Sequence, residues 1–138
     1  MAMRDILLDT NAYVAFKRGV TEAVEVIRHA PLIGINSVVL GELFAGFAVG
    51  SREDANVEEL KRFMGSPRVR LFSLDEVTAS YYAGVYRDLR RMGQPIPTND
   101  MWIAATALQH QLAVMSFDGH FKVVNGLIAG ASLSDFLF

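Results

Sequence analysis

Residues 5–11 read Asp-Ile-Leu-Leu-Asp-Thr-Asn, and this stretch decides the fold. Its apolar run, Ile6–Leu8, is short and ends in Asp9, and two polar residues able to cap a helix follow it. We interpret the run as a strand and Ala12–Arg18 as the helix after it. Active sites of open α/β sheets form where the carboxyl ends of parallel strands gather, so an acid at this position predicts a site there.

Strand and helix patterns alternate along the rest of the chain. We expect strands at Leu32–Ile35, Val69–Phe72, Leu112–Ser116 and Leu127–Ala129, and helices at Thr21–His29, Val38–Phe47, Glu53–Met64, Val77–Met92 and Met101–Gln111. The alternation predicts an α/β fold with a central parallel sheet of about five short strands flanked by helices. In the doubly wound order the first and fourth strands are neighbours.

Composition sets limits on the class of protein. A chain of 138 residues fits one domain, residues 1–138, and its 51% hydrophobic content supports a sizeable core. The absence of cysteine excludes disulfides and thiolate metal sites. A net charge of −2 is unlike that of a strongly basic nucleic-acid binder. We see no signal peptide and no apolar run long enough for a membrane span, so we expect a cytoplasmic protein without membrane contact.

Four acids lie at the element boundaries or just inside a helix: Asp9, Glu42, Asp100 and Asp118. Each has an ordinary explanation when taken alone, as a helix cap, a solvated helix residue or a turn residue. Together they fall at the ends of the first and fourth strands and on two adjoining helices. Carboxylates without basic partners repel one another unless protons or hard cations neutralise them. The set therefore predicts a Mg²⁺ or Mn²⁺ site and phosphate chemistry.

Four motifs give the chain a family resemblance. Leu7–Asn11, Gly41–Leu43, Asn99–Ala105 and Ser116–Phe121 resemble the motifs of PIN-domain nucleases, and most of all those of the VapC-type toxins of toxin–antitoxin systems. The resemblance covers nearly the whole chain. It implies a single PIN domain, with the fold of a PIN-like three-layer sandwich.

The resemblance also implies an activity and a set of site residues. The chain would be a Mg²⁺-dependent endoribonuclease, with Mn²⁺ able to substitute, leaving 5′-phosphate and 3′-hydroxyl ends. The acids Asp9, Glu42, Asp100 and Asp118 would be catalytic and bind one or two ions, Glu42 directly or through water. Residues orienting the carboxylates or the metal's water would be Thr10, Asn11, Asn99 and Ser116.

Partners follow from the same resemblance. VapC-type proteins form homodimers and hold a VapB-type antitoxin in a groove, and they reach promoter DNA only through that antitoxin. For the RNA substrate, Lys17 and Arg18 are the best candidates, because they follow the first motif on the helix that leaves the site. The histidines are not at zinc-site spacing. His120 is the only one close to an acid, and we favour a structural role for it over the alternative of contact with the phosphate.

Two other classes of function compete with the nuclease. Asp9-Thr10-Asn11 faintly resembles the Asp-Xaa-Asp motif of haloacid-dehalogenase-like phosphatases, but Asn11 replaces the second acid and no lysine follows a late strand. A PIN-like scaffold that only binds a partner or RNA would have no need for four mutually repelling acids. A phosphatase would hydrolyse small phosphomonoesters, and a scaffold would cleave nothing.

Overall fold

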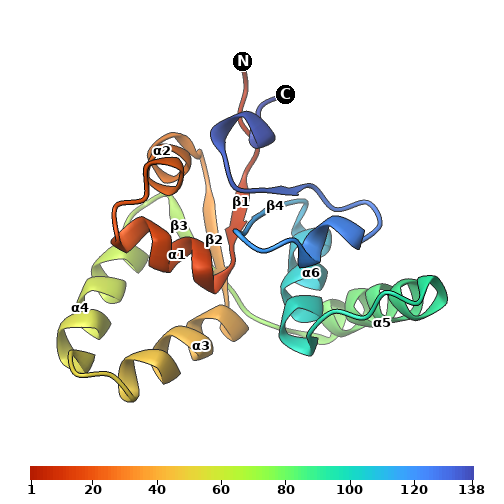
Figure 1. Ribbon diagram of the computed structural model, residues 1–138, viewed down its shortest axis with the longest axis horizontal. Helices are drawn as coiled ribbons and strands as arrows, with labels where there is room; N and C mark the ends of the chain where they lie inside the picture. The colour runs from red at the N-terminus through yellow and green to blue at the C-terminus, as the bar shows by residue number, and fades with distance from the viewer.

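The computed structural model describes residues 1–138 and contains one five-stranded sheet (Figure 1). The strands are β1 (Ile6–Leu8), β2 (Ile33–Asn36), β3 (Val69–Phe72), β4 (Ala113–Met115) and β5 (Ala129–Gly130). All neighbouring strands are parallel, in the order β3-β2-β1-β4-β5. The predicted α/β class, the five short parallel strands and the pairing of the first strand with the fourth are confirmed.

Helices flank this sheet. They are α1 (Thr10–Lys17), α2 (Thr21–His29), α3 (Ser37–Ala48), α4 (Glu53–Met64), α5 (Glu76–Met92) and α6 (Thr98–His110), with 3₁₀ turns η1 (His120–Val123) and η2 (Leu133–Phe136). In Figure 1, helices α1 to α4 lie to the left of the central strands, and α5 and α6 lie to the right. None of the helices combines the length and the apolar character needed to cross a membrane.

The middle of the sheet forms the centre of the hydrophobic core. Every residue of β1 and β4 is buried, as expected for parallel strands covered on both faces. On the neighbouring strand, Gly34 leaves room for the ring of Phe72, because a Cβ at this position would lie 2.8 Å from Phe72 Cε2. The tight packing fixes the carboxyl ends of the central strands, where the acids begin.

Side-chain caps fix where the helices begin. Asn36, at the end of β2, is completely buried, and its Oδ1 accepts a hydrogen bond from the backbone N–H of Val39 at 2.9 Å. Its amide also donates to Thr106 Oγ1 of α6 at 3.1 Å. Asp75 caps α5 in a reciprocal capping box with Thr78. The sequence offers Asn36 or Ser37 and Ser73 or Asp75 as caps before these two helices, and the structure uses Asn36 and Asp75.

Most predicted boundaries were wrong by one to three residues, and three of these differences concern the site or the last strand. α1 begins at Thr10, not Ala12, because Asp9 itself is the cap and its carboxylate accepts from the backbone N–H of Thr10. α6 begins at Thr98, since Pro97, with its ring-fixed φ, takes the position before the helix. Asp100 therefore lies inside the first turn of α6 and does not open it. The last strand is Ala129–Gly130 and not 127–129.

Candidate functional site

All four predicted acids lie in the wall of one cleft at the carboxyl edge of the sheet. Asp9 follows β1, Asp118 follows β4, Glu42 extends from the second turn of α3 and Asp100 from the first turn of α6. The cleft has a volume of about 860 Å³. Segments up to about a hundred residues apart thus contribute to one acidic surface, as expected at the edge where parallel strands end.

Asp9 is the most deeply buried of the four, with 4% of its surface exposed. Its Oδ1 accepts from the backbone N–H of Thr10 at 2.8 Å, and its Oδ2 accepts from Ser116 Oγ at 2.7 Å. Burial raises the pKa of Asp9 to about 6, and the hydrogen bond from Ser116 only partly opposes this effect. A buried carboxylate with a raised pKa gains from a cation placed next to it.

The side chain of Asn11 connects both strand ends. Its Nδ2 lies 3.3 Å from Asp9 Oδ2 and 3.5 Å from Asp118 Oδ2, and its Oδ1 accepts from the backbone N–H of Phe117 at 3.0 Å. One amide thus ties the start of α1 to the loop after β4. The two carboxylates are held near each other before any ligand is considered.

Glu42 is held in the same way from two other elements. Thr10 Oγ1 donates to Glu42 Oε1 at 2.8 Å, and Asn99 Nδ2 donates to Glu42 Oε2 at 3.3 Å. All four residues predicted to orient the acids therefore contact a carboxylate of the set. Glu42 itself is half-buried and lines the cleft from the side of α3.

His120 joins this cluster, and the sequence analysis did not place it there. Its Nδ1 donates to Asp100 Oδ2 at 2.6 Å and lies 3.4 Å from Asp118 Oδ1. Burial raises the pKa of Asp100, although the hydrogen bond from His120 lowers it. The same bond raises the pKa of His120. The sequence signal that His120 lies with the acids was its position two residues after Asp118, in the turn that follows β4.

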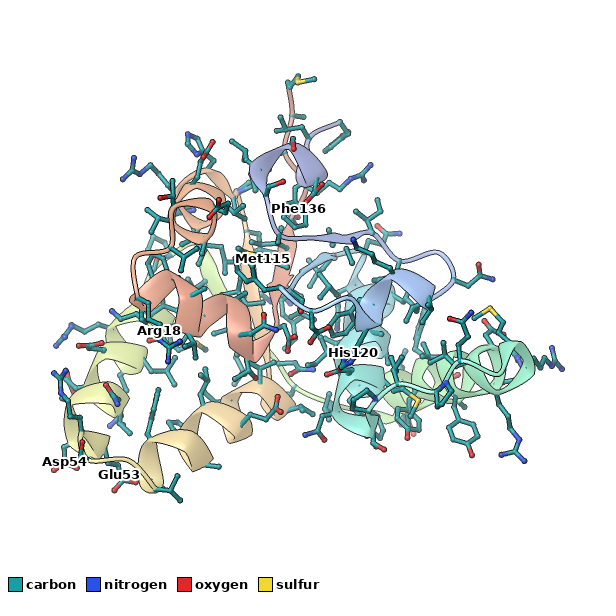
Figure 2. The ribbon with its side chains drawn as sticks, viewed as in Figure 1. Arg18, Glu53, Asp54, Met115, His120 and Phe136 are labelled. Carbon is teal, nitrogen blue, oxygen red and sulfur yellow. The ribbon has the colours of Figure 1, made fainter.

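The two predicted RNA contacts differ in position. Lys17 Nζ forms an ion pair with Glu59 at 3.3 Å and does not line the acidic cleft. Arg18 lines the cleft and takes part in none of the ion pairs of the structure. Figure 2 labels Arg18 at the end of α1 on the side facing α4. Of the pair, only Arg18 lines the acidic cleft, and it also lines a second pocket against α4.

The donor atoms in the cleft fit a divalent cation. Ligand atoms of Asp100, Asp118 and His120 all lie within 4.8 Å of one another. Carboxylate oxygens are the donors that Mg²⁺ and Mn²⁺ prefer, and imidazole nitrogen is a common transition-metal ligand. One histidine and one arginine are the only basic groups that line the cleft, so the crowded acids favour neutralisation by protons or by a cation.

Comparisons with known proteins agree with this geometry. The PIN domain family model matches residues 6–127. Ribonuclease VapC4 of Mycobacterium tuberculosis is 31% identical over 91 residues, covering 66% of this chain and 70% of the relative. DNA-bound VapBC from Salmonella typhimurium has a TM-score of 0.82 at 23% identity, covering 94% of this chain and 98% of that one. FitAcB from Neisseria gonorrhoeae has a TM-score of 0.77 at 28% identity, covering 91% of this chain and 96% of that one.

PIN domains are nucleases, and the acids at the carboxyl edge of the sheet agree with that class. The chain belongs to the PIN-domain family, in the group of ribonucleases named VapC.

Proposed function

We propose that this chain is a divalent-metal-dependent endoribonuclease that acts as the toxin of a toxin–antitoxin pair. The observation that carries the proposal is the convergence of Asp9, Glu42, Asp100 and Asp118 on one cleft. Hydrogen bonds from residues of other elements hold these carboxylates in place. The relative VapC4 is named a ribonuclease, which supports RNA as the substrate class.

Asp9, Asp100 and Asp118 bind the cation in this proposal, and Glu42 binds it directly or through water. The cleft would accept Mg²⁺ or Mn²⁺, because both ions take carboxylate oxygen ligands. When bound, such an ion activates water and neutralises charge on the phosphate in the transition state. No nucleophilic side chain is needed, so the carboxylates act by holding the ion and positioning water.

The neighbouring polar residues have positioning roles. Ser116 and Asn11 hold Asp9 through hydrogen bonds at 2.7 and 3.3 Å. Thr10 and Asn99 hold the two oxygens of Glu42. Carboxylates fixed in this way keep the ion within reach of the scissile phosphate and lose little freedom on binding it.

The RNA contact in this proposal is Arg18. It would bind a backbone phosphate, because it lines the cleft and forms no ion pair. Lys17 plays a smaller part, since Glu59 already neutralises its charge.

The partner in this proposal is a VapB-type antitoxin. Solved structures with this fold include VapBC complexes, among them DNA-bound VapBC from Salmonella typhimurium. We propose that residues 1–138 form one PIN domain that pairs as a homodimer and works in the cytoplasm. DNA contact would come only through the antitoxin.

The test is cleavage of a panel of structured RNAs by the purified chain without antitoxin. Reactions contain Mg²⁺, Mn²⁺ or EDTA, and they compare the wild type with Asp100→Asn. Loss of metal binding should reduce cleavage by at least about 100-fold, because the cation contributes several kcal/mol to transition-state stabilisation. Asp54→Asn removes the same charge from the exposed start of α4, distant from the cleft in Figure 2, and should leave cleavage unchanged.

Two results would contradict this function. Equal cleavage by wild type and Asp100→Asn would assign the activity to a contaminant or to another site. Absence of cleavage together with hydrolysis of a small phosphomonoester would favour the phosphatase class instead.

A further inference from the structure

His120 lies in the gap between two of the acids. It is the first residue of η1, next to α6, and Figure 2 labels it where these two elements meet. Its backbone N–H donates to Asp118 Oδ1 at 2.9 Å, which fixes the turn that carries the ring. Its Nδ1 then reaches Asp100 Oδ2 at 2.6 Å. The Nδ1 atom of the imidazole is thus aimed at the carboxylates, while much of the ring remains exposed.

The separations around His120 match those between ligands of one ion. Neighbouring ligand atoms of an octahedral ion with bonds of about 2.1 Å lie about 3 Å apart. The Nδ1 distances to Asp100 and Asp118, 2.6 and 3.4 Å, fall on either side of this value. The same three side chains can bring their ligand atoms within 4.8 Å of one another. A cation could take the place of the proton between Nδ1 and Asp100 with small side-chain movements.

We propose that His120 is a direct nitrogen ligand of the cation, so that the site prefers Mn²⁺ to Mg²⁺. This inference rests on the metal-dependent function proposed above and adds a residue and an ion preference to it. Mg²⁺ takes oxygen ligands and gives up its water reluctantly, whereas first-row transition ions accept imidazole. Replacing one oxygen by nitrogen therefore favours Mn²⁺ over Mg²⁺.

A competing interpretation is that His120 only forms an ion pair with Asp100 and leaves when a cation binds. The ring is 48% exposed, so it has room to turn outward. The two interpretations differ in one observable, which is a bond between the histidine nitrogen and the bound metal.

The test uses pulsed electron paramagnetic resonance of the full chain loaded with Mn²⁺. A directly bound imidazole gives a hyperfine coupling that changes when histidine nitrogen is isotopically labelled. We expect this coupling in the wild type and its loss in His120→Gln. His29→Gln is the matched control, because His29 lies on α2, exposed, outside the acidic cleft. Circular dichroism checks that each variant is folded.

Affinity provides the second measurement. His120→Gln should weaken Mn²⁺ binding by about tenfold or more, and Mg²⁺ binding by much less. Mn²⁺ bound to the wild type without nitrogen coupling would overturn this inference alone. Failure of the wild type to bind Mn²⁺ at all would overturn it together with the metal-dependent function. Unchanged coupling in His120→Gln would assign the nitrogen to another residue and also overturn it.

Discussion

The central strands β1 and β4 and the edge strand β3 differ in both burial and chemistry. All residues of β1 and β4 are buried, and each strand is followed by acids of the cleft. At the edge, β3 exposes Arg70 and Leu71 and leads to no acid of the set. Parallel strands covered on both faces cannot shift without disturbing the core. Asp9 and Asp118 thus follow the strands whose backbone is held most firmly by the core.

The largest contrast in stability should come from matched truncations in the two regions. Leu7→Ala in β1 removes a fully buried side chain and should cost about 2–5 kcal/mol of unfolding free energy. Leu71→Ala in β3, where 42% of the residue is exposed, should cost only about 0.5 kcal/mol. Urea denaturation measures both. Equal costs would mean that the edge strand is as constrained as the centre.

The next largest effect on stability should come from the ionisation of Asp9 in metal-free buffer. Because its pKa is raised from 3.8 to about 6, folding favours the protonated form. The contribution of Asp9 to the free energy of unfolding is most favourable below pH 3.8 and is lost as the pH rises through about 6. Asp9→Asn in EDTA should therefore stabilise the protein at pH 8 by up to about 3 kcal/mol relative to wild type.

Urea midpoints across the pH range test this expectation, and the gap between the two proteins should close near pH 4. A stability difference between the two proteins that stays constant from pH 4 to pH 8 would show that ionisation of Asp9 does not destabilise the folded state. Added Mg²⁺ or Mn²⁺ should stabilise only the wild type, since Asp9→Asn lacks the charge that attracts the ion.

The helix caps next to β2 and β3 extend the comparison to the loops. Asn36 is completely buried between β2 and α6, so Asn36→Ala should cost about 2 kcal/mol, the upper range for a cap. Asp75 caps α5 beyond the edge strand, so Asp75→Ala should cost about 1 kcal/mol. Thermal unfolding distinguishes the two. A larger cost at Asp75 would reverse the proposed order of the two regions.

The smallest effect should come from the hydrogen bond that orients Glu42. Thr10→Val keeps the shape of the side chain but removes the donor to Glu42 Oε1. Cation affinity should fall by about tenfold, as for other partners that orient metal ligands, with little change in stability. Calorimetric titration with Mn²⁺ measures the affinity. Thr21→Val, at the first position of α2 and without a capping bond, is the control and should bind Mn²⁺ like the wild type.

Much of the fold was predictable because local patterns determined it. The apolar run Ile6–Leu8 and the cap residues Asn36 and Asp75 depend only on neighbouring sequence. The family resemblance named the acids and the residues that orient them, but local patterns could not predict which side chains pair inside the cleft. His120 meets Asp100 across 20 residues and Glu42 meets Thr10 across 32, distances over which only tertiary packing decides. The start of α6 was misplaced because Pro97 ended the loop earlier than its polar sequence suggested.

The amide of Asn11, shared between Asp9 and Asp118, also bears on the entropy of cation binding. Ordering a free polar side chain costs up to about 2 kcal/mol, and here much of that ordering is complete before the cation arrives. The cleft is therefore stiff in the absence of metal, and cation binding contributes affinity without having to organise the chain. Some small metal-binding domains unfold when a chelator removes their metal. This protein should instead keep its fold in EDTA and unfold in a single calorimetric transition.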